Sequence, residues 1–155
     1  MTEYEMWALI IAGVSFLASA ASAIFSFIAN GKCSSATLEL SLRESIRYAN
    51  EKIMDCSADM DVLISKNDLN DEEKVQLELK TKRFNAAVEN YLNAYEEACA
   101  KYVDKKVDKD RFKKMYFSEI RKLVENEKFT QYFNPVTSRY KVTLKVYGEW
   151  YNLEK

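Results

Sequence analysis

The sequence predicts an all-α protein, with a single N-terminal transmembrane helix followed by a four- or five-helix cytoplasmic bundle. Three observations predict this fold class. The 155 residues include one proline and three glycines, so few residues would end a helix. An N-terminal run of 24 residues carries no charge, and after it apolar residues recur three and four positions apart. We expect two parts, with the N-terminal tail and transmembrane helix in residues 1–31 and the bundle in residues 32–155.

The uncharged run covers residues 6–29, MWALIIAGVSFLASAASAIFSFIA. As a helix it would extend about 36 Å, which exceeds the roughly 30 Å of a bilayer's hydrocarbon core. A cleaved signal peptide is the alternative, because the small residues 18–20 resemble a cleavage site. The preceding residues favour an anchor, since they include Glu3 and Glu5 and no Lys or Arg.

Positive charge follows this run and does not precede it. Lys32, Arg43 and Arg47 come after residue 29, so the positive-inside rule places the C-terminal part in the cytoplasm. The three cysteines are odd in number and form no C-x-x-C pair, which is typical of a reducing compartment. We expect a single-pass protein of a bacterial inner membrane, with its N-terminus outside and its C-terminal domain cytoplasmic.

Two long helices are expected next in the chain. Asn30-Gly31 indicates a break after the uncharged run. From there apolar residues keep the helical spacing over residues 34–65. Asn70 and Glu73 have the spacing of a capping box, so a second helix should begin there and continue to about residue 102.

Shorter helices are expected towards the C-terminus. Asp108 would cap a helix that ends near residue 123, and residues 127–133 interrupt the periodic pattern. Asn134-Pro135 would open a final helix, because proline suits the first helical position. Apolar residues also alternate over residues 142–146, which leaves a strand there as the alternative.

The composition excludes several kinds of chemistry. The chain has no histidine, which excludes Ser-His-Asp or Cys-His catalysis and His-containing zinc or haem sites within it. No Gly-rich phosphate loop or metal-ligand spacing occurs. A net charge of −1 gives no general attraction to nucleic acid. We expect no enzymatic activity, no metal site and no cofactor.

Small residues form one stripe along the uncharged run. Steps of three and four positions place every serine of the run on this stripe, together with alanines. In lipid, small residues and interhelical hydroxyl bonds favour close packing of helices. The chain has one such run, so the partners should be copies of itself, either in a closed bundle or around a weakly polar pore. The candidate pore-lining or helix-packing residues are Ala12, Ser15, Ser19, Ser22 and Ser26.

Basic residues suggest two further features. In a ring of copies, Arg43 and Arg47 would lie at the cytoplasmic mouth, where they would favour anions over cations. A second basic stretch covers residues 101–122, but acidic residues dilute it. We expect this stretch to form a solvated turn and helix face. The alternative is a surface that contacts RNA or anionic headgroups.

The late segment SRYKVTLKVY contains the basic residues Arg139 and Lys145 at a spacing known from a nuclease family. Arg139 is followed after five residues by Lys145, in the arrangement R-x(4–6)-H of HEPN ribonucleases but with lysine in place of histidine. With its N-terminal span and helical bundle, the chain resembles the membrane-pore accessory proteins of type VI-B CRISPR systems, which are described as having a divergent HEPN-like bundle. A lysine normally stays protonated at neutral pH, so it would not replace a histidine general acid/base.

The resemblance implies a function as well as a fold. The protein would form a homo-oligomeric pore that strengthens antiviral defence by permeabilising or depolarising the inner membrane beside an RNA-guided, RNA-targeting nuclease. Two alternatives remain from the residues. One is a membrane anchor or scaffold that recruits a soluble partner, and the other is a membrane-tethered, HEPN-like RNA-binding protein.

Overall fold

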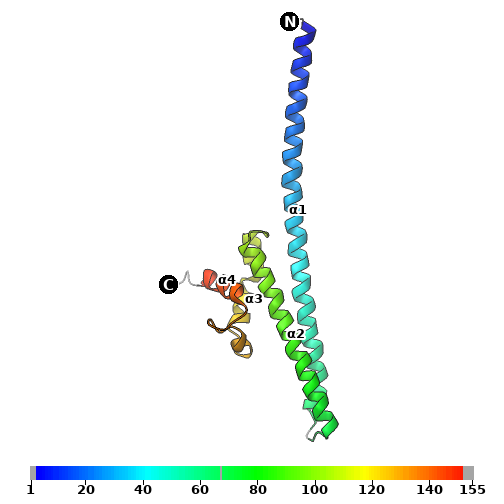
Figure 1. The fold of residues 1–155 in the computed structure, drawn as a ribbon, viewed down its shortest axis with the longest axis vertical. Helices are drawn as coiled ribbons and strands as arrows, with labels where there is room; N and C mark the ends of the chain where they lie inside the picture. Colours follow the sequence, from blue (N-terminus) through cyan, green and yellow to red (C-terminus); the bar gives the residue numbers. More distant parts are fainter. Residues whose placement is uncertain (1–2, 67, 152–155) are drawn as a thin grey trace. The chain divides into compact units, whose positions relative to one another are not determined.

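The computed structural model describes residues 3–66 and 68–151, and their side chains except at residues 3 and 5–14. These residues form only helices and turns (Figure 1), so the predicted all-α fold class is confirmed for them. The chain divides into two compact units, Met1–Thr37 and Leu38–Lys155. The elements in chain order are α1 (Glu3–Ile64), α2 (Asp71–Val103), α3 (Lys109–Val124), the 3-10 helix η1 (Glu127–Tyr132) and α4 (Lys141–Tyr151).

The first unit contains the N-terminal part of α1. Among the described residues, α1 is the one helix that is long and apolar enough to cross a membrane, with a mean hydropathy of 1.2 in its apolar window and none of that window buried. In this unit the large side chains from Phe16 to Ile28 are uncovered, and Phe25 and Phe27 are 74% and 82% exposed.

The break expected at Asn30-Gly31 is wrong, because α1 is helical through both residues. Gly31 does not have a positive φ, and a Cβ added there would meet nothing within 4 Å. One glycine inside a helix costs about 1 kcal/mol relative to alanine. Helix-compatible residues on both sides of Gly31 offset that cost, so the helix continues to Ile64.

In the second unit, the remainder of α1 packs with α2, α3 and α4 around one core. α2 lies against both α3 and α4, and in Figure 1 it runs beside the second half of α1. Lys80 of α2 donates a hydrogen bond to the carbonyl oxygen of Asp59 in α1, at 2.8 Å. The core takes its largest fully buried side chains from α2, α3 and α4, and these are Phe112, Leu92, Ile120, Val146, Thr143 and Cys99.

Aromatic contacts join the core elements. Tyr102 of α2 stacks on Phe112 of α3, with ring centroids 5.2 Å apart. It also meets Trp150 of α4 edge-on at 5.4 Å, and the indole Nε1 donates to the Tyr102 hydroxyl at 3.1 Å. Tyr102 therefore joins α2 to both α3 and α4.

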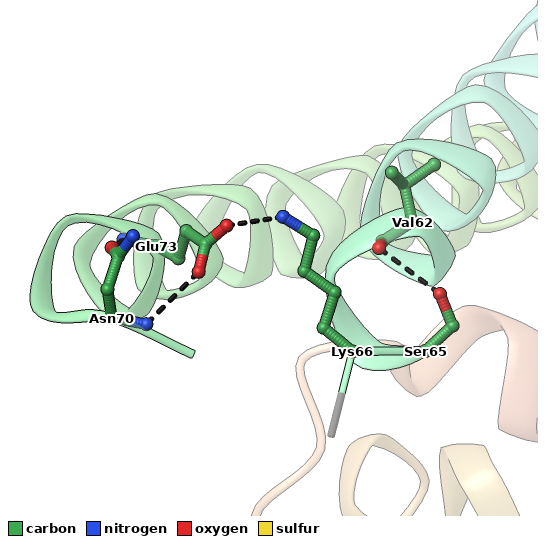
Figure 2. Close-up of polar contacts among 5 residues, drawn as sticks. All are labelled: Val62, Ser65, Lys66, Asn70 and Glu73. Carbon is green, nitrogen blue, oxygen red and sulfur yellow. Dashed lines mark hydrogen bonds and ion pairs between the residues drawn. The ribbon is translucent and has the colours of Figure 1, made fainter. Parts of the chain in front are cut away.

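After the turn that ends α1, α2 begins with the predicted capping box (Figure 2). The Glu73 amide donates to Asn70 Oδ1 at 2.9 Å, and the Asn70 amide donates to Glu73 Oε2 at 3.0 Å. Lys66 forms an ion pair with the same Glu73 carboxylate. The Ser65 hydroxyl donates to the Val62 carbonyl oxygen at 3.2 Å, at the end of α1. Together these contacts end one helix and begin the next.

The start of α3 is also as predicted, since Asp108 accepts a hydrogen bond from the Arg111 amide at 2.9 Å. The predicted start of the final helix at Asn134-Pro135 is wrong. Asn134 instead accepts from the Val136 amide at 2.9 Å within a turn, and α4 begins at Lys141. The strand considered for residues 142–146 is also wrong, because these residues are helical.

Candidate functional site

The serine stripe lies on an exposed part of α1. Ser15, Ser19, Ser22 and Ser26 are all exposed, whereas the side chain of Ala12 lies outside the described residues. The Ser19 hydroxyl donates to the Ser15 carbonyl oxygen one turn earlier, at 2.8 Å. Within the described part of the chain, the hydroxyls of Ser22 and Ser26 make no hydrogen bond. These two hydroxyls therefore remain able to bond to another molecule.

Arg43 and Arg47 line a cleft in the second unit with a volume of about 590 Å³. They lie one turn apart on α1, beside the buried residues Leu42 and Ile46. We call this site the α1–α2–α3 cleft. Its lining residues are Arg43, Ile46, Arg47, Asn50, Tyr91, Tyr95, Met115, Tyr116, Glu119, Lys122, Leu123, Asn126 and Phe129.

Helical spacing places the other polar groups of the cleft. Tyr91 and Tyr95 are one turn apart on α2, and their rings meet edge-on at 5.1 Å. The Tyr95 hydroxyl donates to Glu119 Oε2 of α3 at 3.0 Å. Burial is the main cause that raises the pKa of Tyr95 well above its ordinary value, and this hydroxyl stays protonated. Lys122 follows Glu119 by three residues, so both reach the cleft from the same side of α3.

The cleft has an excess of positive charge. Its charged lining residues are three cations, Arg43, Arg47 and Lys122, and one carboxylate, Glu119. Arg47 forms an ion pair with Glu51 one turn later on α1. Arg43 and Lys122 form no ion pair with any residue that the structure describes. A local excess of cations thus occurs in a chain whose net charge is −1.

Tyr116 adds an unsatisfied hydroxyl to the wall of this cleft. The residue is 5% exposed, and its hydroxyl oxygen is buried without a hydrogen-bond partner among the described residues. Burial raises the pKa of Tyr116 above its ordinary value, the nearby Glu119 raises it further, and Arg43 acts in the opposite direction. The hydroxyl is therefore a neutral donor close to both a cation and a carboxylate.

The two residues of the HEPN-like motif are both exposed. Arg139 is exposed in the turn before α4 and lines a smaller cavity of about 200 Å³ together with Glu89 and Tyr140. Lys145 is exposed on α4 and does not line that cavity. Neither side chain forms a hydrogen bond or ion pair within the described residues.

Two carboxylates accept hydrogen bonds from amides at the N-termini of other helices, and no local sequence signal indicates this role. Glu96 of α2 accepts hydrogen bonds from the amides of Val142 and Thr143 at 2.9 Å each. Glu39 of α1 is buried and accepts from the Asp108 amide at 3.1 Å, while its Oε2 lies 3.2 Å from Arg111 Nη2 without hydrogen-bond geometry. These carboxylates stabilise the fold at helix N-termini, where negative charge is favourable.

No protein-family model, curated protein or solved structure matches this chain. Residues 3–66 and 68–151 also contain no group of three or more His, Cys, Asp or Glu side chains that could hold a metal ion, within the side chains described. The exposed apolar helix and the α1–α2–α3 cleft are therefore the two features of the described chain that bear on its function.

Proposed function

We propose that this chain is a single-pass membrane protein that self-associates through its N-terminal helix, with the helical domain in the cytoplasm. The observation that carries the proposal is the uncovered apolar surface of α1. Large side chains from Phe16 to Ile28 are exposed in the single chain, where a soluble protein would bury them. A bilayer would cover this surface at little cost, because hydrocarbon is as apolar as these side chains.

The two halves of the helix surface support self-association. At 100° per residue, the large side chains Phe16, Leu17, Ile24 and Phe25 lie on one half. The serines and alanines of the stripe lie on the other half. Large side chains suit contact with lipid, and small ones allow a second helix to approach closely. Copies of the same helix would meet stripe to stripe.

The proposal can be tested by measuring the particle size of the full chain in mild detergent. Changing both Ser19 and Ser22 to leucine should convert an oligomer into monomers while the protein stays in the membrane fraction. Changing Ile24 and Ile28 to phenylalanine adds comparable bulk to the other half, and this control should keep the oligomer. Equal particle size for both double variants would contradict the proposal.

A second candidate function is ion passage through the assembled helices. It is favoured by the hydroxyls of Ser22 and Ser26, which have no partner among the described residues and could face a polar lumen. Liposomes that contain the oligomer should then leak ions, and changing Ser22 and Ser26 to alanine should reduce the leak. An intact oligomer that passes no ions would instead favour the anchor or scaffold. In that case, replacing residues 6–29 with an unrelated poly-leucine helix would preserve the recruitment of the soluble partner.

A further inference from the structure

The α1–α2–α3 cleft has two cations, Arg43 and Lys122, that form no ion pair within the described chain. Arg43 reaches it from α1 and Lys122 from α3, so the charges come from separate helices of one packed unit. Glu119 is the single carboxylate of the lining and keeps its charge while it accepts the Tyr95 hydroxyl, so the three cations of the cleft still outnumber it. Cations that outnumber the carboxylates around them favour an anion nearby, so this lining favours an anion in the cleft.

The rest of the lining suits a flat ring. Tyr91 and Phe129 are half-buried, and Met115 is partly exposed beside them. Aromatic faces and a thioether bind planar rings by stacking and by sulfur contacts. Asn50 adds an amide group with a donor and an acceptor of the kind that pairs with the edge of a nucleobase, and Asn126 adds a second amide whose Oδ1 already accepts from the Lys128 amide.

The size and the polar wall agree with a small molecule. A volume of about 590 Å³ lies within the range that small-molecule sites occupy. The Tyr116 hydroxyl at the wall is buried and unpartnered, although buried polar groups in folded proteins nearly always have a hydrogen-bond partner. Because this hydroxyl oxygen is buried, a ligand oxygen in the cleft would reach it only after a movement of the wall.

We propose that the α1–α2–α3 cleft binds a mononucleotide, with its base against Tyr91 and Phe129 and its phosphate at Arg43 and Lys122. This site goes beyond self-association in the membrane, and it does not depend on it. Arg47 would contribute less than Arg43, because its charge is shared with Glu51.

The experiment is a calorimetric titration of the full chain in detergent with each of the four nucleoside 5′-monophosphates. At least one should bind with a Kd below about 1 mM. Inorganic phosphate, glycerol 3-phosphate and the matching nucleoside should each bind about tenfold more weakly or worse, because each lacks one half of the ligand. Glycerol 3-phosphate also stands for a lipid headgroup, which has the phosphate without the ring.

Matched variants assign the binding to the cleft. Arg43→Gln and Lys122→Gln should each weaken it about tenfold or more, since each removes one charge-assisted contact to phosphate. Lys114→Gln removes an equal charge from an exposed position of α3 outside the cleft and should leave the affinity unchanged. Circular dichroism would establish that all three variants stay folded.

Three results would overturn the proposal. The first is that none of the four nucleotides binds. The second is that inorganic phosphate or glycerol 3-phosphate binds as tightly as the best nucleotide, which would leave no role for the aromatic wall. The third is that Lys114→Gln weakens binding as much as Arg43→Gln and Lys122→Gln, which would indicate attraction by general charge alone.

Discussion

Glu96 binds the first turn of α4 through Thr143, although 47 positions separate the two residues. Glu96 Oε2 accepts from the Thr143 amide at 2.9 Å and from the Thr143 hydroxyl at 2.7 Å. The other carboxylate oxygen accepts from the Val142 amide at 2.9 Å. A side chain of α2 thus provides the cap that α4 lacks in its own sequence, and it supplies a negative charge where the helix dipole favours one.

Replacing Glu96 should therefore destabilise the bundle. Glu96→Ala removes three hydrogen bonds from partly buried donors, so we expect the free energy of unfolding to fall by about 2–3 kcal/mol. Chemical denaturation followed by circular dichroism would measure it. The neighbouring Glu97 is exposed and, among the described residues, pairs only with Lys101 one turn later, which makes Glu97→Ala the control, with little expected change. Equal effects of the two variants would contradict the capping role.

Glu39 should have a local effect at the start of α3. Glu39→Ala leaves the Asp108 amide without its acceptor and removes the partner of Arg111, so we expect faster amide hydrogen exchange over residues 108–112. Mass spectrometry of exchanged peptides would detect it. Glu44→Ala, at an exposed position on the same helix, is the control and should leave exchange in α3 unchanged.

Helix starts that depend on nearby residues could be predicted, and the others could not. Asn70, Glu73 and Asp108 act on amides within three positions, so their signal is complete in the local sequence. The start of α4 depends on Glu96, which only the packed bundle brings to Thr143. The local signal at Asn134-Pro135 is real, but it forms a turn before the helix.

The residues of the α1–α2–α3 cleft could likewise be predicted from the sequence only in part. Arg43 and Arg47 could be singled out by charge, but Tyr91, Lys122 and Phe129 come from segments whose contact the sequence does not encode locally. The position of Arg43 and Arg47 at a pore mouth stays a prediction. The resemblance of the segment around Arg139 to the HEPN motif also stays a prediction. The link to an RNA-guided nuclease also stays a prediction.

The cysteines should differ sharply in reactivity. Cys33 is exposed, whereas Cys99 is buried in the core. Burial raises the pKa of Cys99 to about 12, with a smaller lowering by the Thr143 hydroxyl and a smaller rise from Glu96. The thiolate is the reactive form, so at pH 8 a maleimide should label Cys33 within minutes and leave Cys99 unlabelled until the protein is denatured. Peptide mass spectrometry would identify each site, and rapid labelling of Cys99 in the folded protein would contradict its place in the core.

Gly31 tests whether α1 is continuous beyond the apolar segment. A Cβ at this position meets nothing within 4 Å. Gly31→Ala should therefore stabilise the helix by about 0.5–1 kcal/mol, because alanine loses less backbone entropy than glycine. Gly31→Pro should disrupt the helix here, because proline lacks the amide donor and its ring clashes with the preceding turn. Circular dichroism of the full chain in detergent should show equal or higher helicity for the alanine variant and lower helicity for the proline variant. Equal helicity in both would indicate that residues 30–31 form a break.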